Sequence, residues 1–286
     1  MKKTLIALAV AASAVVSGSA MAAGWQENSA SGEVNFGGQI NANSQVTWMW
    51  LIGEGKSDFV HKTQDLTNNN QTLTITADND IPILAGKLKN GVAGSDFSIA
   101  NTFPSISFLS SGTAVTPEFN TNGALALTVK AFDDQGAEFG TLKINGRAAG
   151  SVALATPAPN TTYKTYGAGV PGTDGIFSGG LANNGTLLVW SGLATTKVVE
   201  KFGGPALAEL EDQVRDVTSD SSAVFNDVNN VWGISRSNNE DMNMRAYSLS
   251  YGFGVEQGAT LELNFTKPVT TTTVWKAPLT VQISYN

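Results

Sequence analysis

Cysteine is absent from this sequence of 286 residues, and histidine occurs only once. These two gaps exclude disulfides, thiol chemistry, cysteine-based zinc sites and most histidine-dependent catalysis. Charged residues are also scarce, at 14% of the chain, and acidic residues outnumber basic ones by 24 to 17. Because no basic patch large enough to follow a phosphate backbone is visible, we expect no nucleic-acid partner.

Long hydrophobic runs are missing after the first residues, so we expect no membrane-spanning helix in the mature protein. The first residues have the pattern of an export signal. Lys2 and Lys3 precede an apolar run from Leu5 to Val16, and Ala20-Met21-Ala22 is a small-x-small cleavage site. We therefore predict a signal peptide over residues 1–22 and export of the remainder.

Short segments of alternating apolar and polar residues recur along the chain, separated by turns rich in Asn, Asp and Gly. Such spacing favours an antiparallel β-sandwich. The alternating apolar residues are Val46, Trp48, Trp50 and Ile52; Leu73 and Ile75; Leu125, Leu127 and Val129; Tyr247, Leu249, Tyr251 and Phe253; Leu261, Leu263 and Phe265; and Leu279, Val281, Ile283 and Tyr285.

The middle of the chain has a helical pattern instead. Pro205 is placed as a first-turn residue before a segment with one apolar helical face. A second helical candidate follows it. We interpret residues 135–235 as an insertion carried by the sandwich. The apolar positions are Leu207, Leu210, Val214 and Val217 in the first segment and Val224, Val228 and Val231 in the second.

A strand pattern also follows directly after the predicted cleavage site. A strand at a free terminus can pair within its own sheet or with the open edge of another molecule, and the pattern alone leaves both open. Pairing with another molecule would produce a non-covalent polymer. The alternating positions are Ala30, Gly32, Val34, Phe36, Gly38 and Ile40.

Several of these segments resemble the FaeG-like major adhesive subunits of chaperone–usher fimbriae. The resemblance rests on the run from Gly32 to Ile40, on Trp48-Met49-Trp50 with Gly53-Glu54-Gly55, and on Leu73-Thr74-Ile75-Thr76 with Pro82-Ile83-Leu84. It is most specific over Lys267 to Asn286, with Trp275 and Ala277-Pro278-Leu279. It covers about 23–90 and 235–286 and is weak in the middle of the chain.

The resemblance implies an immunoglobulin-like sandwich that lacks one strand. A periplasmic chaperone would fill the gap first, and the N-terminal extension of the next subunit would replace it during assembly at an outer-membrane usher. Residues 23–40 would then be the donor extension and 41–286 the pilin domain. The inward donor side chains would be Ala30, Gly32, Val34, Phe36, Gly38 and Ile40, and the acceptor strand bound by the chaperone would carry Leu279, Val281, Ile283 and Tyr285.

One position departs from the general pilin pattern. Many fimbrial subunits have a disulfide and a glycine fourteenth from the end, whereas this chain has no cysteine and has Thr273 there. The FaeG-like group resembles this chain in both respects.

No catalytic or cofactor motif stands out, so we expect no cofactor and no enzyme. Gly167 to Gly172 matches G-x-G-x-x-G, but Val170-Pro171 blocks a clean helix start, which favours a turn-rich loop. The carboxylates Asp78, Asp80, Asp133 and Asp134 lie in turn sequences, where solvated side chains are typical.

The predicted function is a major subunit of a surface fimbria that chains to copies of itself and adheres to host-cell glycans. Receptor contacts are expected in the insertion, where they would draw on Tyr163, Tyr166, Asp174, Trp190 and Trp232; the two tryptophans can equally be core residues. Two alternatives stay open. One is a purely structural shaft subunit, and the other is a secreted carbohydrate-active enzyme that uses two carboxylates.

Overall fold

A computed structural model describes residues 46–98, 103–169, 175–235 and 244–285. The chain divides into two compact units, Met1–Ala42 and Asn43–Asn286, and every described residue belongs to the second. The predicted signal peptide, the predicted donor positions Ala30 to Ile40 and the candidate Asp174 lie outside the described residues. Within the described ranges, no helix combines the length and the apolar character needed to cross a bilayer.

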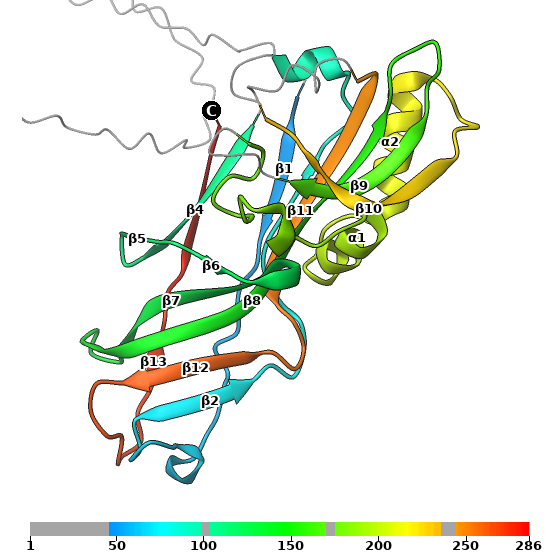
Figure 1. The fold of residues 1–286 in the computed structure, drawn as a ribbon. Coiled ribbons are helices and arrows are strands. Elements are labelled where there is room, and N and C mark those ends of the chain that lie inside the picture. The colour runs from blue at the N-terminus through cyan, green and yellow to red at the C-terminus, as the bar shows by residue number, and fades with distance from the viewer. Residues whose placement is uncertain (1–45, 99–102, 170–174, 236–243, 286) are drawn as a thin grey trace, which may run out of the picture. The chain divides into compact units, whose positions relative to one another are not determined.

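The described part is mostly strand, with two α-helices and four short 3-10 helices (Figure 1). The strands are β1 Trp48–Ile52, β2 Thr72–Thr76, β3 Ile81–Leu88, β4 Pro104–Ser110, β5 Thr113–Val115, β6 Glu118–Phe119, β7 Ala124–Asp133, β8 Glu138–Ala155, β9 Tyr163–Gly169, β10 Phe225–Gly233, β11 Ala246–Val255, β12 Thr260–Phe265, β13 Trp275–Lys276 and β14 Thr280–Tyr285. The helices are α1 Gly192–Lys201 and α2 Leu207–Thr218, and the 3-10 helices are Thr63–Asp65, Gly94–Ser98, Thr121–Gly123 and Gly185–Leu187.

The strands form two sheets. The larger has 11 strands and a main order of β1-β3-β11-β8-β12-β2, and the smaller has the order β14-β4-β5. Their inner faces meet in the main core, where Phe108 on β4 makes an edge-to-face contact with Phe253 on β11 at 5.3 Å between ring centroids. Two mainly antiparallel layers packed on a shared apolar core make the immunoglobulin-like sandwich that the alternating segments predict.

The 18-residue strand β8 joins the two halves of the larger sheet. Its first part pairs with β7 and β12, and its last part, from Arg147 to Ala155, pairs with β11 and β9. β8 starts inside the range 135–235, so the first part of that range is a central strand of the sheet. The two helices lie in the later part of the range, between β9 and β10.

Small side chains on β8 and β11 explain how the helices approach the sheet. Both faces of β11 are buried, and large residues alternate with small ones along it. A Cβ added at Gly252 would lie 2.7 Å from the Cα of Val199 on α1, so only glycine permits this approach. The small residues on this face are Ala149, Ser151, Ala153 and Ala155 on β8 and Ala246, Ser248, Ser250 and Gly252 on β11.

Helix α2 confirms that the first predicted segment is helical, although Pro205 precedes the N-cap residue Ala206 and does not lie in the first turn. It begins at Leu207, two residues after Pro205, and buries Leu210 and Val214 against β8 and β11. Helix α1 was not predicted, because its buried face contains hydroxyl residues. Thr195 and Thr196 are buried there and hydrogen-bond to Ser151 on β8 at 2.7 and 3.1 Å, so the usual apolar stripe is interrupted.

The second helical prediction is wrong. Residues 225–233 form β10, which pairs in parallel with β9. A bulge between Asp227 and Val231 shifts the register, so Val228 and Val231 both pack against the main core although they are three residues apart. Val224 precedes the strand and is 76% exposed. The segment is also rich in Asn and β-branched residues, which are poor helix formers.

Candidate functional site

The C-terminal strand β14 lies at the edge of the smaller sheet. It pairs antiparallel with β4 from Thr280 opposite Leu109 to Tyr285 opposite Pro104, and no described strand pairs with its other side. Val281 and Ile283 are half-buried against the main core, whereas Gln282 and Ser284 are exposed. This matches the alternation that the sequence predicts, with Leu279 half-buried just before the strand. Tyr285 is 38% exposed at the end of β14.

The strand β1 lies at an edge of the larger sheet. It pairs with β3 on one side only, and no described strand pairs with the other side. Trp48 and Trp50 stack with ring centroids 5.7 Å apart, and both rings contact the buried ring of Phe177 edge-on. Gly86 on β3 makes room for Trp50, because a Cβ added there would lie 2.2 Å from the indole ring.

A hydrogen bond connects these two edges. The indole Nε1 of Trp50 donates to the hydroxyl of Tyr285 at 2.8 Å. β1 and β14 belong to different sheets, and this bond links the middle of β1 to the last residue of β14, with half-buried core side chains on both strands. Unpaired N–H and C=O groups beside an apolar core are the features that accept an added strand.

The four described candidate glycan residues in the insertion do not form one surface site. Tyr163 and Tyr166 are each 7% exposed, so their rings present no face to solvent. The Tyr163 hydroxyl donates to Asp220 at 2.8 Å, and the pKa of this carboxyl is lowered by hydrogen bonds from Ser222 and Tyr163. Tyr163 therefore anchors β9 to the turn after α2.

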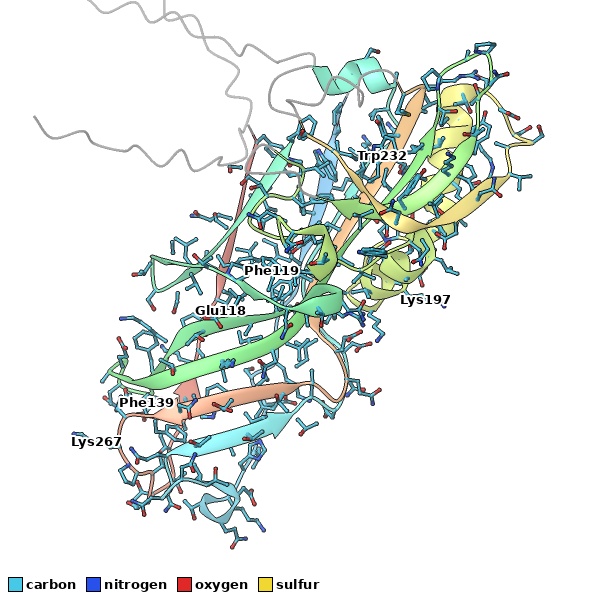
Figure 2. All side chains as sticks on the ribbon, in the orientation of Figure 1. Glu118, Phe119, Phe139, Lys197, Trp232 and Lys267 are labelled. Carbon is cyan, nitrogen blue, oxygen red and sulfur yellow. The ribbon has the colours of Figure 1, made fainter. Side chains whose placement is uncertain are left out.

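The two tryptophans differ from each other. Trp232 is half-buried against Tyr166, at 5.3 Å between ring centroids, and its position is labelled in Figure 2. Trp190 is 43% exposed, and its Nε1 donates to the carbonyl of Gly185 at 2.8 Å. Among the described candidates, Trp190 is therefore the one whose ring is accessible to a ligand.

A surface cleft that sequence reasoning missed lies between β6, β8 and α1. Two adjoining hollows of about 570 and 440 Å³ share Asn122, Arg147 and Glu256 as lining residues. Figure 2 shows Glu118 and Phe119 on β6 and Lys197 on α1. No motif indicates this cleft, because its residues come from segments far apart in the chain.

An ion-paired cluster forms the centre of the cleft. Arg147 Nε donates to the carbonyl of Asn122 at 2.9 Å, and its Nη1 lies 3.3 Å from Glu256 Oε2. Lys201 Nζ lies 2.6 Å from Glu256 Oε1. Burial raises the pKa of Glu256, but the Lys201 hydrogen bond and the charges of Arg147 and Lys201 outweigh it, so the net pKa lies below its ordinary value.

The turn carboxylates have structural partners. Asp78 pairs with Lys56 at 2.7 Å, and Asp80 accepts a hydrogen bond from the backbone of Gln257 at 2.7 Å. Asp133 accepts from the backbone N–H groups of Gln135 and Ala137 at 3.0 and 2.8 Å. In the part of the chain that the structure describes, no group of three or more His, Asp or Glu side chains is placed to hold a metal ion.

The described residues form an immunoglobulin-like sandwich in which no described strand pairs with the outer edge of β1 or of β14. Comparison of the sequence with known proteins identifies the family to which this chain belongs. The chain belongs to the family described as "Fimbrial, major and minor subunit", whose model matches residues 1–286.

Curated relatives from Escherichia coli agree with this family over the full length of both chains. The F41 fimbrial protein is 35% identical, and the K88 fimbrial proteins AD and AB are each 33% identical. The chain is therefore a fimbrial subunit that assembles with other subunits in a surface fimbria. This confirms the FaeG-like resemblance noted in the sequence.

Proposed function

We propose that this fimbrial subunit polymerises by donor-strand exchange and that the resulting fibre adheres to host glycans. One observation carries the first part. No described strand pairs with the outer edge of β1 or of β14, and a hydrogen bond from Trp50, in the middle of β1, to Tyr285, at the end of β14, links the two strands. A strand placed between the two edges would satisfy backbone groups on both sides and cover the half-buried Val281 and Ile283.

Residues 30–40 supply a matching strand in the next subunit. Val34, Phe36 and Ile40 alternate with polar or small residues, as a strand with one face in an apolar groove requires. Each large apolar side chain buried in this way contributes about 1.5–3 kcal/mol. We include a periplasmic chaperone and an outer-membrane usher in the proposal, because an open edge needs a partner before the next subunit arrives.

The test uses two substitutions of equal charge on opposite faces of the predicted donor strand. Val34→Asp places a carboxylate on the inward face and is expected to abolish chains, because an unpaired charge would be buried. Asn35→Asp places the same charge on the outward face and is expected to leave chain length unchanged. Fibre length is measured by electron microscopy and by gel electrophoresis of unheated fibres. Full-length chains from Val34→Asp, or from a deletion of residues 23–40, would contradict strand donation.

The adhesive part of the proposal rests on the accessible ring of Trp190 and on the polar cleft at Arg147. A glycan array probed with purified fibres tests it. Binding to any host-type oligosaccharide supports adhesion, and a fibre that binds none is a structural shaft only. We propose no enzymatic activity, because the carboxylates of Asp78, Asp80 and Asp133 already pair with Lys56 or with backbone groups.

A further inference from the structure

The cleft beside Arg147 has the size of a ligand site. Its two hollows, of about 570 and 440 Å³, each fall in the range of about 300–1,000 Å³ that is typical of small-molecule pockets. They meet at Asn122, Arg147 and Glu256, so one elongated ligand can occupy both. We call the two hollows together the Arg147 cleft.

Basic side chains outnumber acidic ones around the Arg147 cleft, although the whole chain has a net charge of −7. A local positive field of this kind attracts an anionic group to a protein that repels anions elsewhere. The basic lining residues are Lys143, Arg147, Lys197 and Lys201, and the acidic ones are Glu118 and Glu256.

Only two of the four basic residues, Arg147 and Lys201, form ion pairs within the cleft. Glu256 is shared between Arg147 and Lys201, which fixes the centre of the cleft. Lys143 and Lys197 are exposed on either side of that centre and form no ion pair among the described residues. Each of their ammonium groups can donate to a ligand carboxylate or sulfate, and charge-assisted hydrogen bonds of this type are about twice as strong as neutral ones.

The rest of the lining suits a sugar. The amide of Asn120 accepts from the backbone of Thr121 and can still donate, the amide of Asn145 donates to Thr260 and can still accept, and the hydroxyl of Thr121 adds a further partner. Phe119 contributes a half-buried aromatic ring. The carboxylates of Glu118 and Glu256 would repel a densely charged polyanion, so the lining favours a ligand with many hydroxyls and few negative charges.

We propose that the Arg147 cleft binds a glycan whose contacting sugar carries a single acid group, either a carboxylate or a sulfate. This inference rests on the proposed adhesion to glycans and specifies the ligand class and the residues. Lys197 contacts the acid group, the charge of Lys143 in the other hollow adds to the positive field that attracts it, the amides bind the sugar hydroxyls, and Phe119 packs against a sugar ring.

The experiment compares one oligosaccharide in three forms, namely neutral, sialylated and sulfated. Fibres of the full chain are tested by glycan array and by titration calorimetry with the same soluble sugars. We expect at least about tenfold tighter binding of one acidic form than of the neutral form, equivalent to about 1.4 kcal/mol. The preference is expected to weaken as salt rises, because exposed charges are screened. Preference for the sialylated form indicates a carboxylate ligand, and preference for the sulfated form indicates a sulfate ligand.

Three matched lysine variants locate the binding. Lys197→Gln is expected to remove most of the acidic preference, and Lys143→Gln is expected to reduce it. Lys267→Gln removes the same charge from an exposed position that lines neither hollow and lies away from Lys197 in Figure 2, so its binding stays unchanged. Normal fibre yield from all three variants shows that the subunits still fold.

The failures of the two proposals are distinguishable. Equal binding of the neutral and acidic forms would contradict the proposal that the Arg147 cleft binds an acidic glycan, and so would an acidic preference that survives Lys197→Gln and Lys143→Gln together. Both outcomes are compatible with the proposed adhesion to glycans. Fibres that bind no glycan of any form overturn adhesion and the cleft with it.

Discussion

The indole Nε1 of Trp50 donates a hydrogen bond to the hydroxyl of Tyr285 at 2.8 Å, across 235 residues of sequence. Trp50 lies on β1 and Tyr285 on β14, so the bond joins the edge strands of two different sheets. The bond therefore connects the middle of β1 with the last residue of β14.

Loss of the Tyr285 hydroxyl tests this connection. Tyr285→Phe removes one hydrogen bond between partly exposed groups, which is worth about 0.5–1.5 kcal/mol. For a domain of this size, we expect fibres to melt about 1–6 °C lower in calorimetry. Ser284→Ala, at the exposed neighbouring position, is the control and is expected to melt with the unaltered fibre. Equal melting temperatures for Tyr285→Phe and Ser284→Ala would show that the hydrogen bond between Trp50 and Tyr285 does not stabilise the fibre.

A second prediction concerns the two faces of β14. Ile283 is half-buried against the core, and Gln282 beside it is exposed. Ile283→Asp is expected to abolish fibre assembly, because it puts an unpaired charge beneath the added strand. Gln282→Asp carries the same charge on the outer face and is expected to assemble normally. Measurement of surface fibres by immunoblot after heat extraction distinguishes the two, and comparable assembly of both variants would contradict the assigned faces.

A third prediction concerns pH. The pKa of Glu256 lies below its ordinary value in the folded chain, because the hydrogen bond from Lys201 and the charges of Arg147 and Lys201 outweigh its burial. A lowered folded pKa contributes stability that is present above the unfolded pKa and is lost as pH falls through the folded pKa. Glu256→Gln is therefore expected to be less stable than the unaltered chain at pH 7, by about 1 kcal/mol at most for a partly exposed pair.

Thermal unfolding between pH 7 and pH 3 checks this prediction. The difference between Glu256→Gln and the unaltered chain is expected to be constant above the ordinary carboxyl range, near the pKa of 4.5, and to shrink below it. Glu118→Gln, a lining residue with no ion pair among the described residues, is the control. A difference that persists undiminished at pH 3 would mean that Glu256 acts through packing and not through its charge.

A fourth prediction concerns the close approach of α1 to β11. Gly252→Ala would bring a Cβ to 2.7 Å from the Cα of Val199, so the helix must move. Overpacking of this kind destabilises by about 1–3 kcal/mol. Gly169→Ala is the matched control, because the nearest atom to its added Cβ is 3.4 Å away, an ordinary contact distance. Calorimetry of fibres carrying each substitution should show a lower melting temperature for Gly252→Ala alone.

Prediction from sequence worked best where one face of a strand is buried. The alternation at Leu73 and Ile75, at Leu125 to Val129 and at Leu279 to Ile283 corresponds to β2, β7 and β14. In these segments the burial of each residue follows from its place in a period of two. Helix α2 was also predictable, because Pro205 precedes an apolar stripe that the sheet covers.

Prediction failed where tertiary contacts changed the usual pattern. In α1, Thr195 and Thr196 can be buried because the hydroxyl of Ser151 donates to Thr195 and accepts from Thr196, and no local rule anticipates these contacts. In β10, a bulge gave strand residues a helical spacing. The sequence nevertheless contained a signal that helices pack on this face of the sheet. Small residues alternate with large ones along β11, at Ala246, Ser248, Ser250 and Gly252, and small side chains permit a close approach of a helix.

The amino-acid sequence by itself determined the β-rich class, the positions of most strands and the absence of thiol chemistry, since these depend on composition and local periodicity. The tertiary structure alone decided that the edges of β1 and β14 meet at Trp50 and Tyr285, and that Arg147, Lys197 and Glu256 share one cleft. The physical reason is distance along the chain. These side chains come from separate strands and a helix, and only the packing of the sheets brings them together.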